Sequence, residues 1–239
     1  MQTERPYNLI QDPLYYVTLL FFALVTTVPP ALIGQPTFLP VAQAISLTIF
    51  AALAIRRGSL RQALIVVGIW LITQFVLMAA LTWLVPTRLD LVFANGFNLR
   101  TATLQWFYTG QDLPRTLAVG SGTVLMEAAG VILGSLATGG LIGAFFLVRA
   151  VNFAAFGMGG LLAADVSLLA ALPIWTLIKL AGYAGLFVHL SRPLLIKDLS
   201  ATTLLGQHRR LLMISAGLLI GGLLLELFLP GLWSGWFGQ

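Results

Sequence analysis

The chain contains no cysteine and only two histidines, which excludes several kinds of chemistry. Without thiols it has no disulfide, no thiolate metal site, no iron–sulfur cluster and no cysteine nucleophile. His189 and His208 do not have the spacing of a ligand pair, so we expect no metal site. The motifs HExxH, GxSxG and GxxxxGK[ST] are also missing. The sequence therefore favours a role other than catalysis and identifies no cofactor.

Charged residues are scarce as well, at 9% of the chain, whereas 59% is hydrophobic. A soluble domain carries about a quarter charged residues, so too few are present here to cover a globule of this size. The mean hydropathy of +0.95 is typical of a chain that lies mostly in lipid. The sequence predicts an all-α, polytopic membrane helix bundle of six or seven transmembrane helices, forming a single transmembrane domain over residues 1–239.

Four apolar runs have the length of a span, about 20 residues. They are Leu14–Ile33, Thr37–Ile55, Gln62–Val85 and Leu211–Leu229. A further helix is expected from Pro173 to about Leu190. The first residues, MQTERPYNLIQDP, carry mixed charges, and no cleavage pattern follows the next apolar run. We therefore expect a short tail before a retained helix.

The segment from Leu117 to Leu172 is apolar but longer than two spans require. We expect a long or tilted helix from Ser121 to Val148, a turn at Arg149, and a helix from Ala150 to Leu172. The alternative is a turn at Gly139-Gly140, which would put Arg149 inside the bilayer at a cost of about 2.5 kcal/mol or more. In the preferred arrangement Arg149 and Asn152 lie one helical turn apart at the cytoplasmic end, with Arg149 as an anchor that extends toward water.

The thirteen basic and eight acidic residues lie mainly between the apolar runs. A cytoplasmic N-terminus puts nine basic residues inside, namely Arg5, Arg56, Arg57, Arg61, Arg149, Arg192, Lys197, Arg209 and Arg210. Only Arg88, Arg100 and Arg115 are then outside. This distribution follows the positive-inside rule and favours the plasma membrane, or the inner membrane of a bacterial cell. No basic stripe with interleaved aromatics is present, so we expect no nucleic-acid partner.

A long loop and a set of tryptophans fall on the predicted outer side. The loop, residues 86–116, alternates apolar and polar residues and is either a lid or docking surface, or a simple amphipathic connection. In the same arrangement five tryptophans would form an interfacial belt, namely Trp83, Trp106, Trp175, Trp233 and Trp236.

Small residues recur every fourth position in two of the runs. They are Gly130, Gly134, Gly139 and Gly143 in the middle region, and Gly217 and Gly221 in the last run. This spacing lets helix backbones approach closely in lipid. The pattern predicts helix packing within the chain, or contact with a second copy or another membrane subunit.

Four ionisable residues fall inside the predicted spans at similar heights: Glu127, Asp165, Lys179 and Glu226. Glu127 and Lys179 follow the starts of helices that run in the same direction, so we expect them to pair. An uncompensated charge in the bilayer is costly, which leaves two interpretations: a proton- or cation-coupled binding site, or a structural ion pair.

The sequence thus favours a small permease or transporter component whose polar cluster binds an ion or substrate. The alternative is a non-catalytic structural subunit or assembly factor of a larger membrane complex. The expected partners are the lipid bilayer and, in the second case, other membrane subunits or further copies of the chain.

Overall fold

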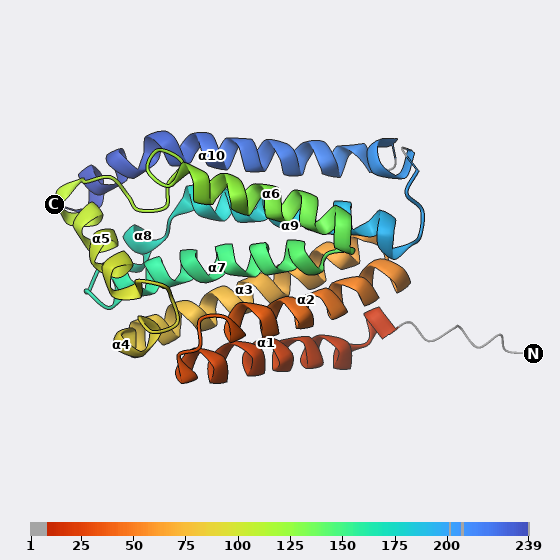
Figure 1. Cartoon of the computed structure of the whole chain (residues 1–239), viewed down its shortest axis with the longest axis horizontal. Coiled ribbons are helices and arrows are strands. Elements are labelled where there is room, and N and C mark those ends of the chain that lie inside the picture. Colours follow the sequence, from red (N-terminus) through yellow and green to blue (C-terminus); the bar gives the residue numbers. More distant parts are fainter. Residues whose placement is uncertain (1–8, 201, 207, 239) are drawn as a thin grey trace, which may run out of the picture.

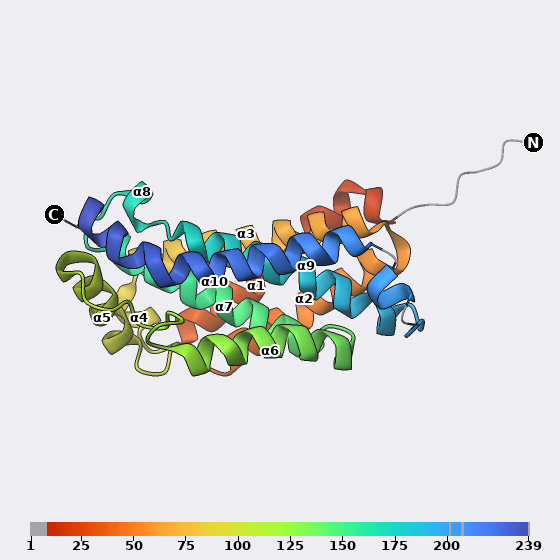
Figure 2. The same ribbon diagram turned by 90° about the horizontal axis from the view of Figure 1, so that it is seen from above.

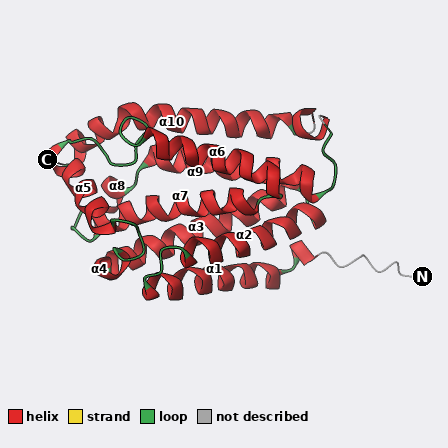
Figure 3. Cartoon of the chain, viewed as in Figure 1, coloured by secondary structure: helices red, strands yellow, loops and turns green. Residues whose placement is uncertain are grey.

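The chain folds into a bundle of long helices (Figure 1) in this computed structural model, which describes residues 9–200, 202–206 and 208–238. These residues form helices and loops, with no strand among them (Figure 3). The elements are η1 (Leu9–Gln11), α1 (Pro13–Ile33), α2 (Phe38–Arg57), α3 (Leu60–Leu84), α4 (Pro86–Leu89), α5 (Gly96–Thr109), α6 (Ser121–Thr138), α7 (Leu141–Leu162), α8 (Leu168–Ala171), α9 (Ile174–Leu195), η2 (Thr202–Gly206) and α10 (Arg209–Phe237).

Seven of these helices are long and apolar enough to cross a membrane: α1, α2, α3, α6, α7, α9 and α10. Their side chains facing outward are largely hydrophobic, including Phe21, Ile72, Leu133 and Phe228. In water such a surface would be unstable, whereas in lipid it is solvated. The helical membrane bundle predicted from composition is confirmed, and the chain has the architecture of a multi-pass integral membrane protein.

The spans alternate in direction, so the start of α1 and the end of α10 lie at opposite ends of the bundle (Figures 1 and 2). We call the end that carries α4, α5 and α8 the C-terminal end, and the opposite end the N-terminal end. Seven basic residues of the described chain lie at the N-terminal end, namely Arg56, Arg57, Arg61, Arg192, Lys197, Arg209 and Arg210. Arg5 lies outside the described residues.

The turn between α6 and α7 is at Gly139-Gly140, so the preferred turn at Arg149 was wrong. The two glycines have φ angles of 63° and 109°, a conformation that side chains with a Cβ rarely adopt. Arg149 instead lies within α7, half-buried, with its guanidinium carbon 5.6 Å from the Phe153 ring centroid. The free-energy cost of placing Arg149 inside the bilayer is reduced, because its guanidinium lies beside protein groups such as the Phe153 ring rather than lipid.

Glycines allow close packing of the α6–α7 hairpin. A Cβ at Gly134 would lie 2.9 Å from the backbone nitrogen of Gly143, and one at Gly143 would lie equally close to the nitrogen of Ser135. A Cβ at Gly130 would overlap the ring of Phe146. By contrast, a Cβ at Gly217 or Gly221 would meet no atom within 4 Å, so this pair lies on an open face of α10.

A buried amide network connects α2, α3 and α7. The Gln74 side chain donates to Asn152 Oδ1 at 2.8 Å and to the Val148 carbonyl at 2.9 Å, and it accepts from the Trp70 indole at 3.1 Å. Asn152 donates to Gln43 Oε1 at 2.7 Å. Asn152 is therefore not a cytoplasmic anchor, because it lies in the middle of α7 and holds neighbouring helices together.

Replacing Gln74 with leucine should lower the free energy of unfolding by about 1–3 kcal/mol. The indole N–H of Trp70 and the side-chain oxygen Oδ1 of Asn152 would each lose a hydrogen-bond partner. The lower part of that range is expected, since hydrogen bonds between transmembrane helices average about 0.6 kcal/mol. Unfolding in detergent measures the effect. Gln105→Leu, at an exposed position on α5, is the control, and equal losses in the two variants would contradict a structural role for the network.

Candidate functional site: a charged cavity beneath α5

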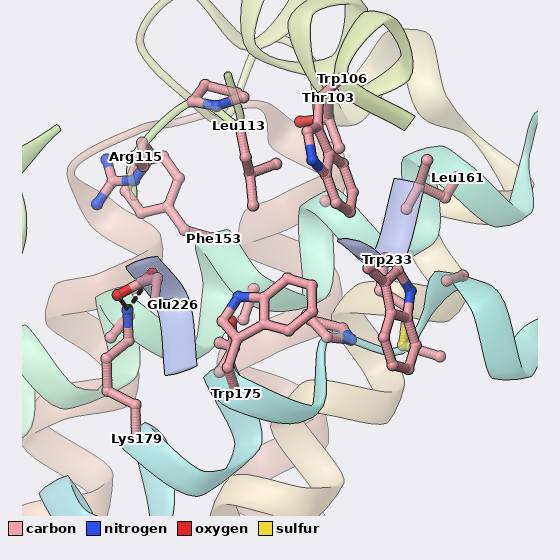
Figure 4. A pocket seen from close by; sticks show the side chains of 18 of the residues that line it. Thr103, Trp106, Leu113, Arg115, Phe153, Leu161, Trp175, Lys179, Glu226 and Trp233 are labelled. Atoms are coloured by element: carbon pink, nitrogen blue, oxygen red, sulfur yellow. Dashed lines mark hydrogen bonds and ion pairs between the residues drawn. The ribbon is translucent and has the colours of Figure 1, made fainter. Parts of the chain in front are cut away.

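A cavity of about 100 Å³ lies at the C-terminal end of the bundle, beneath α5 and the loop that follows it (Figure 4). Side chains from α5, α6, α7, α9 and α10 line it, as do Leu113, Pro114 and Arg115 of the loop. The predicted outer loop thus forms α4, α5 and part of the cavity wall. The charged members of the lining are Arg115, Glu127, Lys179 and Glu226.

Lys179 and Glu226 form a buried ion pair between α9 and α10. The lysine ammonium lies 2.7 and 2.8 Å from the two carboxylate oxygens, and the side chains are only 7% and 4% exposed. Gly222, one helical turn before Glu226, makes this geometry possible. A Cβ at Gly222 would lie 2.7 Å from the backbone nitrogen of Lys179, so only glycine lets the two backbones come this close.

Glu127, in the second turn of α6, pairs with Arg115 from the preceding loop. The Arg115 guanidinium also stacks over the Phe153 ring, with its carbon 3.4 Å from the ring centroid. Burial lowers the pKa of Arg115 from its ordinary value, while the Glu127 carboxylate acts in the opposite direction. Arginine nevertheless stays protonated because its ordinary pKa lies far above neutral pH.

The predicted Glu127–Lys179 pair is not formed. The two residues do lie at the expected level, each in the second turn of its helix, and both line the cavity. Instead, the Arg115 guanidinium forms an ion pair with the Glu127 carboxylate, and the Glu226 carboxylate forms one with the Lys179 ammonium. Counting depth along the helices did not identify Arg115, because its position depends on how the loop folds back over the bundle.

Asp165 does not belong to the cluster. It lies in the turn after α7 with a φ of 59°, its side chain is exposed, and it does not line the cavity. The expectation that it falls inside a span was a consequence of the misplaced turn, since α7 ends at Leu162 rather than Leu172.

Arg149 does not line this cavity. It lines a second cavity of about 230 Å³, together with Asn152 and residues of the α1–α2 and α4–α5 connections. Phe153 borders both cavities, and the guanidinium carbons of Arg115 and Arg149 lie 3.4 and 5.6 Å from its ring centroid. Arg149 is therefore not a cytoplasmic anchor at a helix end.

Three tryptophans of the predicted interfacial belt line the cavity instead and are almost fully buried, namely Trp106, Trp175 and Trp233. Trp175 packs edge-to-face against both of the others, with ring centroids 6.2 and 5.6 Å apart. The indole N–H of Trp106 donates to the Pro230 carbonyl, and that of Trp233 donates to the Ala170 carbonyl. Among the residues that the structure describes, the Trp175 N–H has no hydrogen-bond partner, although Trp175 is only 1% exposed.

Within the described part of the chain, no group of three or more His, Asp or Glu side chains is placed to hold a metal ion. Comparison with known proteins found no matching family model, no matching curated sequence and no matching solved structure. The function of the cavity is therefore inferred from its residues and their geometry.

Proposed function

We propose that the protein is a small membrane permease, or the permease component of a transporter, and that the cavity beneath α5 is its solute-binding site. The observation that carries this proposal is the placement of four charged side chains around one internal cavity in a bundle with very few charges. Ionisable groups within membrane spans commonly mark solute or ion pathways. The cavity is partly open rather than fully enclosed, and the Arg115 side chain in its wall is 23% exposed whereas its partner Glu127 is 6% exposed.

A purely structural ion pair explains these features less well. One buried pair would neutralise Lys179, and the helices would then pack around it without a cavity. Here two pairs share one hollow with an indole N–H that has no acceptor. Groups held beside an empty space and lacking a partner are what a ligand-binding site requires.

Glu127→Gln should abolish or strongly reduce solute uptake in liposomes, because it removes the ion pair that positions Arg115 in the wall of the cavity. Uptake of radiolabelled lactate, propanesulfonate, choline and alanine by reconstituted protein measures this effect. Asp165→Asn is the control, since this exposed carboxylate does not line the cavity. The proposal fails if the wild-type protein takes up none of these solutes, or if both variants retain full uptake.

A non-catalytic role in a larger membrane complex is the second candidate, and one observation favours it. Gly217 and Gly221 lie on an open face of α10, where they would let the backbone of a partner helix come close between exposed side chains such as Ile214 and Leu224. Purification from native membranes tests this role. A discrete complex that is lost in a Gly217→Leu, Gly221→Leu variant would support it, and an isolated protein would oppose it.

We also propose that the N-terminal end faces the cytoplasm of the cell whose plasma membrane holds the protein. Seven basic residues at this end against three at the other support the orientation. Because the chain lacks cysteine, single cysteines report topology without background. In intact cells a membrane-impermeant maleimide should label Gln111→Cys and should label Leu199→Cys only after lysis. The reverse pattern would invert the orientation.

A further inference from the structure

We propose that the cavity binds a small organic anion, with the anionic group held by Arg115, Lys179 and the indole N–H of Trp175. This inference rests on the proposed function, because it assigns a ligand class to the same cavity. It is a statement about binding and does not require transport. Three observations carry it: the charge balance of the site, the hydrogen-bonding capacity that remains free, and the character of the remaining lining.

The charge balance is positive only when Arg149, which does not line this cavity, is counted with the four charged lining residues. The side chains that line the cavity contribute two positive charges, on Arg115 and Lys179, and two negative charges, on Glu127 and Glu226. Arg149 adds a third positive charge nearby, with its guanidinium carbon 5.6 Å from the Phe153 ring centroid. In a medium of low dielectric constant an excess positive charge attracts a counter-ion. A ligand with one negative charge would bring the site to neutrality.

The free hydrogen-bonding capacity favours an acceptor as ligand. Each carboxylate of the site already binds a basic side chain, so a cationic ligand would have to compete with Arg115 or Lys179. An anion can bind beside these pairs, because Arg115 donates to Glu127 through Nη2 and a guanidinium has five N–H donors. The Trp175 N–H, in contrast, is a donor without an acceptor. Figure 4 shows the nitrogen-bearing edge of Trp175 turned toward the side of the cavity where Lys179 and Glu226 lie. An oxyanion placed there would accept from the indole while it contacts the basic groups.

The rest of the lining sets the size and character of the ligand. Much of the remaining lining is apolar and includes Leu113, Met158, Leu161 and the Trp106 ring. A volume of about 100 Å³ accommodates a ligand of only a few non-hydrogen atoms. The fitting class is therefore a monocarboxylate or monosulfonate with a short hydrocarbon body, rather than a nucleotide or a sugar phosphate.

Ligand binding to the full chain in detergent tests the inference without requiring transport. Lactate and propanesulfonate should raise the melting temperature of the wild-type protein, whereas choline and alanine should not. Trp175→Phe keeps a ring in place but removes the donor, so the affinity for both anions should fall about tenfold or more. Trp83→Phe, at a half-exposed tryptophan outside the cavity, is the matched control and should bind as the wild type does.

The outcomes separate this inference from the proposed function. Stabilisation by choline, no stabilisation by either anion, or unchanged anion affinity in Trp175→Phe would each overturn the anion site. Anion binding without uptake in liposomes would support the site and contradict transport. Uptake of choline or alanine without anion binding would support transport and overturn the anion site.

Discussion

Replacing Lys179 with methionine is expected to lower the free energy of unfolding by about 3–5 kcal/mol. The substitution keeps the length of the side chain but removes the ammonium that neutralises the Glu226 carboxylate at 2.7 Å. Glu226 would then remain buried, at 4% exposure, without its partner. The cost is large because a buried charge without a counter-charge loses its hydration and gains nothing in return.

The double variant Lys179→Met, Glu226→Leu should recover most of that loss, because two apolar side chains of similar volume can replace a buried ion pair at little cost. Comparison of the wild type, the two single variants and the double variant by unfolding in detergent gives the coupling energy. Additive losses would mean that the two residues do not depend on each other. The double variant should also lose solute uptake, which a purely structural pair would not predict.

Gly222→Leu should be a strongly destabilising change on α10. A Cβ at this position would lie 2.7 Å from the nitrogen and 2.8 Å from the Cα of Lys179, and helix backbone cannot move aside as a flexible side chain can. Overpacking of this kind costs about 1–3 kcal/mol and occasionally more. Because α9 and α10 would separate, the Lys179–Glu226 pair should also be weakened, so the total loss should approach that of Lys179→Met.

The neighbouring glycine provides a matched control for this prediction. Gly221→Leu adds the same side chain one residue earlier, where a Cβ meets no atom within 4 Å. Its melting temperature in detergent should equal that of the wild type or exceed it slightly, since leucine is the better helix former. Similar destabilisation in both variants would show that α10 resists any large side chain, and not that Gly222 is required for its contact with α9.

Much of the site could be found from the sequence because charges inside apolar runs are rare. Glu127, Lys179 and Glu226 were identified in this way, and the first two were placed at a common level. Their partners were not found, since pairing depends on which helix faces which. The contact of α9 with α10, made at Gly182 and Gly222, brings Glu226 to Lys179. The pattern also pointed to Gly217 and Gly221, although Gly222 is the residue that packs.

Arg115 and Trp175 show a second limit. In the sequence Arg115 is one of three basic residues of an apparent outer loop, and Trp175 resembles an interfacial aromatic. Both line the cavity, because the loop folds back over the bundle and α5 covers the end of α9. The position of a loop residue such as Arg115 does not follow from the periodicity of the helices. Its contact with a buried site is therefore visible only in the folded chain.

By itself the sequence determined the helical membrane class, since a chain with so few charges and such long apolar runs can satisfy its backbone hydrogen bonds in lipid only as helices. It also determined which side chains would be costly to bury. Only the tertiary structure decided the turn at Gly139-Gly140, the two ion pairs and the cavity between them. The physical reason is that apolar periodicity records the burial of a helix face, whereas ion pairing and packing depend on contacts between residues far apart in the chain.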